Sequence, residues 1–135
     1  MADAIRCAGA IIFDSSSRLL LVKRVNEPGA GLWSVPGGRC MSGESAAAAC
    51  VREVAEETGL IVRVVRPVGS VLREGPADVL YAIDDFLCEV LGGALRAGDD
   101  ADEARWVPPA DLARLPLVPG LEVALRDWRL WPVED

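Results

Sequence analysis

Residues 38–60 read GRCMSGESAAAACVREVAEETGL, and this stretch carries the clearest structural pattern in the chain. From Ser45 to Thr58 it is rich in alanine and glutamate, which favour helices, and it contains no internal glycine or proline. Gly59 follows at once and suits a helix C-terminus, because glycine adopts the left-handed conformation without a steric penalty. The stretch therefore predicts a helix over residues 45–58 that ends at Gly59.

The acidic side chains of this helix are predicted to lie together. With about 100° of rotation per residue, Glu53, Glu56 and Glu57 fall within an arc of roughly 100° on one face. Such a stripe is usually just solvated, but like charges at this spacing repel, and only Arg52 is near enough to offset the repulsion. A bound cation would turn that repulsion into ligation.

Working outward, apolar and β-branched runs bounded by turn residues predict strands. These segments are residues 5–13 and 19–22, paired as a hairpin, and then 33–35, 61–65, 68–72, 79–90, 94–96 and 104–107. The run 79–90 is long enough for a central strand. Asp84 and Asp85 interrupt it, and we interpret them as the mark of a bulge or a sheet edge.

Two further helices are predicted near the C-terminus, over residues 109–115 and 120–131. The second places Leu121, Leu125 and Trp128 on one face at helical spacing. One early helix, two late helices and the intervening strands predict an α+β or layered α/β/α arrangement with a mixed sheet.

Length and charge limit the classes of function. The 135 residues predict one domain over residues 1–135. The net charge is −7 and Lys23 is the only lysine, so no basic stripe can follow the backbone of a nucleic-acid duplex. An acidic protein that handles phosphates needs a cation between the two sets of negative charge, which indicates a divalent metal.

Residue types that are absent or scattered exclude other chemistry. The chain has no histidine, which excludes histidine-containing triads, histidine zinc sites and imidazole bases, so carboxylates must carry any acid–base work. The four cysteines form no C-x-x-C pair and are expected to be reduced thiols. The apolar stretch 7–13 is far too short to span a bilayer. We therefore expect no membrane association and a cytoplasmic location.

The spacing within residues 38–60 resembles the Nudix box. The residues that carry the resemblance are Gly38, Glu44, Arg52, Glu53, Val54, Glu56, Glu57, Gly59 and Leu60. Residues 32–38 and 103–107 are also similar to Nudix hydrolases, of the MutT-like or ADP-ribose pyrophosphatase-like kind. The resemblance implies a Nudix-type α/β/α sandwich that uses Mg²⁺ or Mn²⁺ to cleave the pyrophosphate linkage of a nucleoside diphosphate joined to another group.

The resemblance also implies roles for residues of the box. Glu53, Glu56 and Glu57 are the expected metal ligands, joined by the backbone carbonyl of Gly38, and Glu56 is either a ligand or the base that activates water. Arg52 is expected to orient a glutamate through a charge-assisted hydrogen bond. The candidate catalytic residues are thus Arg52, Glu53 and Glu56, while Glu44 is expected to organise the loop before the helix.

Outside the box, the resemblance implies one more carboxylate from a late loop. Glu103 is the candidate metal ligand, and Asp99, Asp100 and Asp102 are its rivals, although acidic turns are commonly just solvated. Lys23 and Arg24 end a strand that faces the glycine loop, so they are candidate substrate-binding residues for a phosphate. The alternative for both is an ordinary surface charge.

Several alternatives stay open at the level of sequence. The chain could be a Nudix-fold nucleotide-binding or sensing module without turnover, or a structural domain with an acidic helix. The substrate could be a nucleoside triphosphate or an ADP-ribose-like compound, because selectivity resides in loops and pocket walls outside the box. Its expected partner is a small nucleotide, and a homodimer is also open.

Overall fold

The computed structural model of this chain describes residues 4–27, 29–98 and 101–132. Its elements in chain order are β1 (Ile5–Ile12), β2 (Leu19–Arg24), β3 (Trp33–Ser34), β4 (Gly37–Arg39), α1 (Ala46–Thr58), β5 (Leu60–Glu74), η1 (Pro76–Asp78), β6 (Leu80–Gly93), β7 (Ala101–Val107), α2 (Pro109–Leu112) and α3 (Leu121–Asp127). The predicted combination of helices with a mixed sheet is confirmed.

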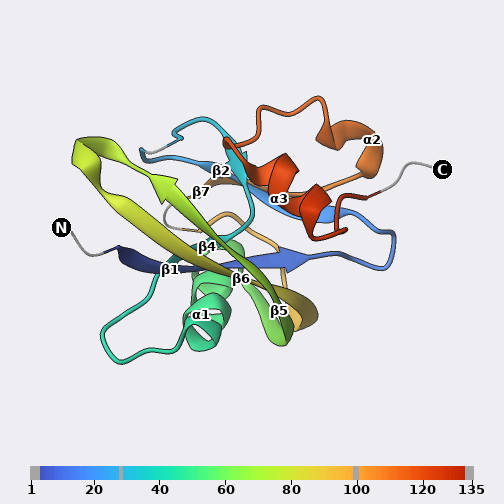
Figure 1. Cartoon of the computed structure of the whole chain (residues 1–135). Helices are drawn as coiled ribbons and strands as arrows, with labels where there is room; N and C mark the ends of the chain where they lie inside the picture. The colour runs from blue at the N-terminus through green and yellow to red at the C-terminus, as the bar shows by residue number, and fades with distance from the viewer. Residues whose placement is uncertain (1–3, 28, 99–100, 133–135) are drawn as a thin grey trace.

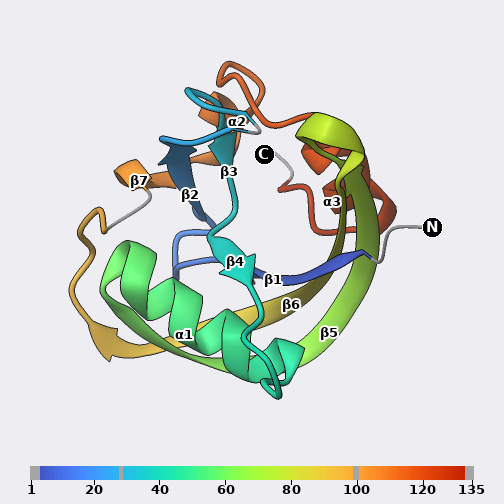
Figure 2. The same cartoon turned by 90° about the vertical axis from the view of Figure 1, so that its left-hand side faces the viewer.

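The strands form two sheets. The larger has the order β4-β1-β6-β5, and it is mixed because β1 and β6 run parallel while the other pairs are antiparallel. The smaller, of order β3-β2-β7, is antiparallel. Helix α1 lies on one side of β1 and β6, and α3 lies on the opposite side (Figure 1). Figure 2 shows β5 and β6 as a long curved ribbon that runs from α1 toward α3.

Helix α1 is held by its caps and by one apolar face. The Ser45 hydroxyl accepts a hydrogen bond from the Ala48 N–H at 3.1 Å, which satisfies a free donor at the N-terminus. Gly59 has φ 75° and donates its N–H to the Ala55 carbonyl at 3.0 Å, as the sequence predicts. Cys50 and Val54 are fully buried in the core with residues of β1 and β5. The buried face fixes the opposite, acidic face of the helix in place.

A second core joins the smaller sheet to the C-terminal segment. Leu21 of β2 packs there with Ile11 of β1, and Leu121 and Leu125 of α3 are buried in the same cluster. Trp128 packs at the margin of this cluster, so the predicted apolar face of the last helix is confirmed. In the part of the chain that the structure describes, the longest helix has 13 residues, and none is long and apolar enough to cross a membrane.

The predicted hairpin of residues 5–13 and 19–22 is wrong. Only one isolated bridge, between Phe13 and Leu19, joins the two segments, and β1 and β2 belong to different sheets. The Asp14 carboxylate closes the turn between them by accepting from the N–H groups of Ser16 and Arg18, each at 2.9 Å. Strand β2 then pairs with β3 and β7 instead, which the local sequence did not reveal.

Other boundaries also differ from the prediction. Segments 61–65 and 68–72 form the single 15-residue strand β5, which passes Pro67 with shifts in register but stays paired to β6 on both sides. No strand forms at 94–96, where the Arg96 N–H instead donates to the Thr58 carbonyl at 2.8 Å. Both late helices are shorter than predicted. Helix α3 stops at Asp127, since Arg129 has φ 59° and the Leu130 N–H turns back to the Leu125 carbonyl at 2.7 Å.

Candidate active site

The glycine strand β4 lies directly against the acidic face of α1. A Cβ at Gly38 would stand 2.5 Å from the Glu53 carboxyl carbon, so only glycine leaves room for that carboxylate. The neighbouring Gly37 N–H donates to Glu57 Oε2 at 3.4 Å, and Glu57 is only 8% exposed. Strand pairing with β1 holds β4 in this position. The fold therefore brings Gly38, Glu53 and Glu57 together.

Arg52 links the glutamates beside this strand. Its guanidinium donates twice to Glu44, with Nε to Oε2 and Nη2 to Oε1 both at 2.8 Å, and Nη1 donates to Glu53 Oε1 at 2.7 Å. Longer contacts of 3.3 Å reach the carboxylate of Glu56. One cation thus offsets the repulsion of three carboxylates and fixes Glu53 relative to the loop that carries Glu44.

The same hydrogen bonds set the protonation of the network. The Arg52 guanidinium, assisted by the Met41 N–H, lowers the pKa of Glu44 to about 2. In return, hydrogen bonds to Glu44 and Glu53 raise the pKa of Arg52 above its ordinary value. Both groups therefore stay ionised at any physiological pH, and the position of Glu53 does not depend on pH through them.

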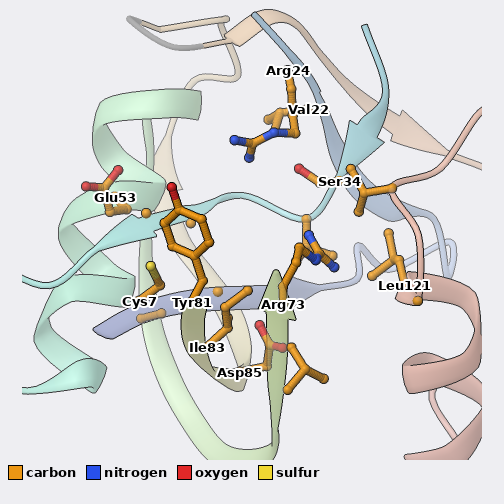
Figure 3. A pocket seen from close by; sticks show the side chains of 18 of the residues that line it. Cys7, Val22, Arg24, Ser34, Glu53, Arg73, Tyr81, Ile83, Asp85 and Leu121 are labelled. Carbon is orange, nitrogen blue, oxygen red and sulfur yellow. The ribbon is translucent and has the colours of Figure 1, made fainter. Parts of the chain in front are cut away.

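A cavity of about 470 Å³ opens beside these residues. Glu53, Glu57 and Gly38 line one part of it, and Arg24 lines the wall contributed by β2. Figure 3 shows the Arg24 side chain reaching into the space between β2 and the larger sheet. A phosphate group placed between Arg24 and the glutamates would meet a positive side chain on one side and the carboxylates on the other.

Three other candidate residues do not form the wall of this cavity. Of the described residues, Glu56, Lys23 and Glu103 are not among those that line it. Lys23 stands opposite Glu103 in the β2–β7 register, and Glu103 Oε2 accepts from Arg105 Nη2 at 3.1 Å in an exposed pair. Among the described residues, Glu103 is therefore not part of the cavity wall that Glu53 and Glu57 form. Asp99 and Asp100 lie outside the described residues, and Asp102 is in β7.

Sequence reasoning missed the other part of the cavity. Asp85 and Tyr81 line it from β6, and Arg73 lines it from β5 (Figure 3). Burial raises the pKa of Asp85 to about 7, although Arg73 acts in the opposite direction and Asp84 adds to the rise. Strand β6 lies between β1 and β5, so Asp84 and Asp85 do not mark a sheet edge. The register shift next to them is in the partner strand β5, between Pro67 and Gly69. The sequence did contain a signal for this. Side chains alternate between the two faces of a strand, so within the run 79–90 Asp85 had to face inward if Asp84 faced solvent.

The match to known proteins agrees with this arrangement. The family model described as NUDIX domain matches residues 4–128. This chain belongs to the NUDIX family. An ADP-ribose pyrophosphatase of Methanocaldococcus jannaschii is 39% identical to this NUDIX chain over 124 residues, which cover 89% of this chain and 70% of that protein.

Further relatives of this NUDIX protein are similar in sequence and in structure. A putative 8-oxo-dGTP diphosphatase of Bacillus subtilis is 36% identical over 125 residues, covering 90% of this chain and 78% of that protein. The crystal structure of a MutT NUDIX hydrolase from Burkholderia pseudomallei has a TM-score of 0.82 at 26% identity, covering 93% of this chain and 98% of that one. The predicted family, fold class and enzyme class, a hydrolase of phosphoric anhydrides, are confirmed.

The donor set of the NUDIX site fits a hard divalent cation. Mg²⁺ is commonly held by one or two carboxylates together with water and substrate phosphates. Glu53 and Glu57 supply two carboxylates, and Gly38 leaves the space beside Glu53 free of a side chain. Among the residues that the structure describes, no three acidic or thiol groups converge closely enough to enclose an ion by themselves. An ion held by Glu53 and Glu57 would need further oxygen ligands, such as water and substrate phosphates.

Proposed function

We propose that this chain uses Mg²⁺ or Mn²⁺ to hydrolyse the pyrophosphate linkage of a nucleoside diphosphate joined to a second group. One observation carries the proposal: two glutamates of α1, with the glycine strand beside them, line a cavity that the Arg24 side chain of β2 also lines. The relatives named ADP-ribose pyrophosphatase and 8-oxo-dGTP diphosphatase support this substrate class, since both named compounds contain a nucleoside diphosphate unit.

The residues divide the work by position. Glu53 and Glu57, with the Gly38 carbonyl, would hold the cation, which when bound supplies positive charge to the phosphate oxygens. Arg52 is a positioning residue that fixes Glu53 through the 2.7 Å hydrogen bond. Glu56 shares that guanidinium and has a half-exposed side chain, so we assign it to accept the proton of the attacking water or to complete the cation site.

Arg24 is the group that we assign to the substrate phosphates. Its cationic side chain lines the cavity from β2, whereas Lys23 stands in register with Glu103 outside it.

All four cysteines are free thiols, which suits the reducing cytoplasm as the location.

A product assay with matched variants tests the proposed function. ADP-ribose, 8-oxo-dGTP and GTP are incubated with the protein and Mg²⁺, with and without a chelator, and products are separated by chromatography. Glu57→Gln should lower turnover by at least about 10²-fold while preserving the fold, because it removes a buried charge without changing side-chain size. Glu122→Gln is the control, since Glu122 forms an exposed ion pair with Arg126 on α3.

The results separate the two leading functions. Turnover that requires the metal and is lost in Glu57→Gln supports the hydrolase. Nucleotide binding without turnover would favour a binding or sensing module. Turnover of Glu57→Gln within threefold of the wild type would contradict the assignment of the reaction to the Glu57 site.

A further inference from the structure

Asp85 is buried at the cavity wall with an unused hydrogen-bond acceptor. The residue is 6% exposed and lines the cavity, and its Oδ1 atom is buried with no hydrogen-bond partner. Buried carboxylate oxygens almost always have partners in folded proteins. Asp84, the next residue, shows the contrast: it is exposed and accepts a hydrogen bond from the Ser70 hydroxyl at 2.6 Å.

The surrounding backbone makes room for this carboxylate. Gly9 lies opposite Asp85 in the β1–β6 register, and a Cβ at Gly9 would overlap the Asp85 Oδ1 atom. Gly9 in turn pairs with Gly37 of β4, whose N–H contacts Glu57. Asp85 and Gly37 are thus two strands apart, which puts their Cα atoms about 10 Å from each other at ordinary strand spacing. Gly37 is the residue that contacts the glutamate site.

Apolar side chains surround the Asp85 part of the cavity. Ile83 of β6 and Leu121 of α3 line it, as does the indole of Trp128. Trp128 packs on Gly69, the residue opposite Asp85 in β5, where a Cβ would stand 2.5 Å from the ring carbon Cε2. Figure 3 shows Asp85, Ile83 and Leu121 around one region of the pocket, with Glu53 at a distance. Arg73 of β5 lines this part as well, and its charge acts on the Asp85 carboxyl. Apolar walls with a buried acceptor at one point suit a flat ring that carries an N–H donor on its edge.

We propose that Asp85 determines base specificity by accepting a hydrogen bond from the amino group of the substrate's nucleobase. The inference rests on the proposed function only in taking the ligand to be a nucleotide. Above pH 7 the ionised Asp85 carboxylate can only accept. A base with a carbonyl in place of the amino group would then present an acceptor to an acceptor and leave the carboxylate unpaired. Sites built to bond a donor reject analogues that lack it, because the buried group of the protein then stays unsatisfied.

Binding of mononucleotides tests the proposal without turnover. Calorimetry at pH 8.5, where the Asp85 carboxyl is ionised, measures the Kd of the wild type for AMP, GMP and IMP, and for CMP and UMP, without added metal. Removing the amino group, as in the change from AMP or GMP to IMP or from CMP to UMP, should weaken binding at least tenfold for the base that the cavity accepts. Asp85→Asn, whose amide both donates and accepts, should reduce that preference to threefold or less, whereas the control Asp84→Asn should preserve it.

Each outcome decides the proposal. The proposal is overturned if the wild type has the same Kd for AMP, GMP and IMP and the same Kd for CMP and UMP, or if it binds no mononucleotide. It is also overturned if Asp85→Asn keeps the wild-type ratio of these Kd values. Should Asp85→Asn fail to fold, the comparison of bases in the wild type and an Asp85→Ser variant still decides it. Metal-dependent hydrolysis with no preference between bases would remove this inference and leave the proposed function standing.

Discussion

Replacing Asp85 by asparagine should change how the stability of this protein depends on pH. The carboxyl has a pKa of about 7 in the folded protein because it is buried, whereas an unfolded chain has a value of about 3.9. The folded state therefore holds a proton that the unfolded state has released. Its stabilising effect is complete below about pH 4 and declines as pH rises to about 7.

The size of the effect follows from the two pKa values. Between pH 5 and pH 8 the free energy of unfolding of the wild type should fall by about 2.5 kcal/mol through Asp85 alone. The chain has no histidine, so no imidazole titrates in this range and obscures the effect. Asp85→Asn cannot ionise, and its stability relative to the wild type should increase by that amount over the same interval.

Urea unfolding at the two pH values measures this difference. The control is Asp84→Asn, which removes an exposed carboxylate from the neighbouring position. It should retain most of the pH dependence of the wild type, because burial rather than Asp84 is the main cause of the raised Asp85 pKa. If the stability of Asp85→Asn relative to the wild type were the same at pH 5 and pH 8, Asp85 would have to be ionised in the folded protein at both values. The description of its buried environment would then be wrong.

Three further changes test the site and its helix. Gly38→Ala should lower activity more than stability, since its Cβ would stand 2.5 Å from the Glu53 carboxyl carbon and would displace that carboxylate. Gly92→Ala, which has open space, is the control in urea unfolding and turnover assays. Gly59→Val should cost more than about 1 kcal/mol because Gly59 has φ 75°, and a loss near zero would show that this conformation is unimportant. Mg²⁺ at about ten times its Kd should add about 1.4 kcal/mol of stability by mass action, and NaCl of equal ionic strength should raise the Tm less.

Local sequence was sufficient for the helix that carries the glutamates. Its alanine-rich composition, Ser45 and Gly59 act within a few residues, so the boundaries of α1 follow from short-range physics. The proximity of Gly38 to Glu53 instead required the family pattern. It depends on the pairing of β4 with β1, which no local preference of residues 37–39 specifies.

Long-range pairing explains what the sequence could not show. Glu103 and Lys23 face each other because β2 pairs with β7. A hairpin of residues 5–13 and 19–22, which the local sequence predicts, gives no indication of that pairing. Alternation along β6 puts Asp84 and Asp85 on opposite faces of the sheet. Which of the two faces meets the cavity depends on how the sheet packs against the rest of the chain, and the sequence of the strand does not encode that packing.

The bond that is broken gives the most direct test of the central claim, that the glutamate site hydrolyses a phosphoric anhydride in one step. The protein is given ADP-ribose or 8-oxo-dGTP with Mg²⁺ in H₂¹⁸O, and the products are analysed by mass spectrometry. The account predicts cleavage between two phosphorus atoms with one ¹⁸O in a single phosphate product, and little release of phosphate from AMP. A trapped phosphoryl- or nucleotidyl-enzyme, or efficient hydrolysis of AMP, would contradict it.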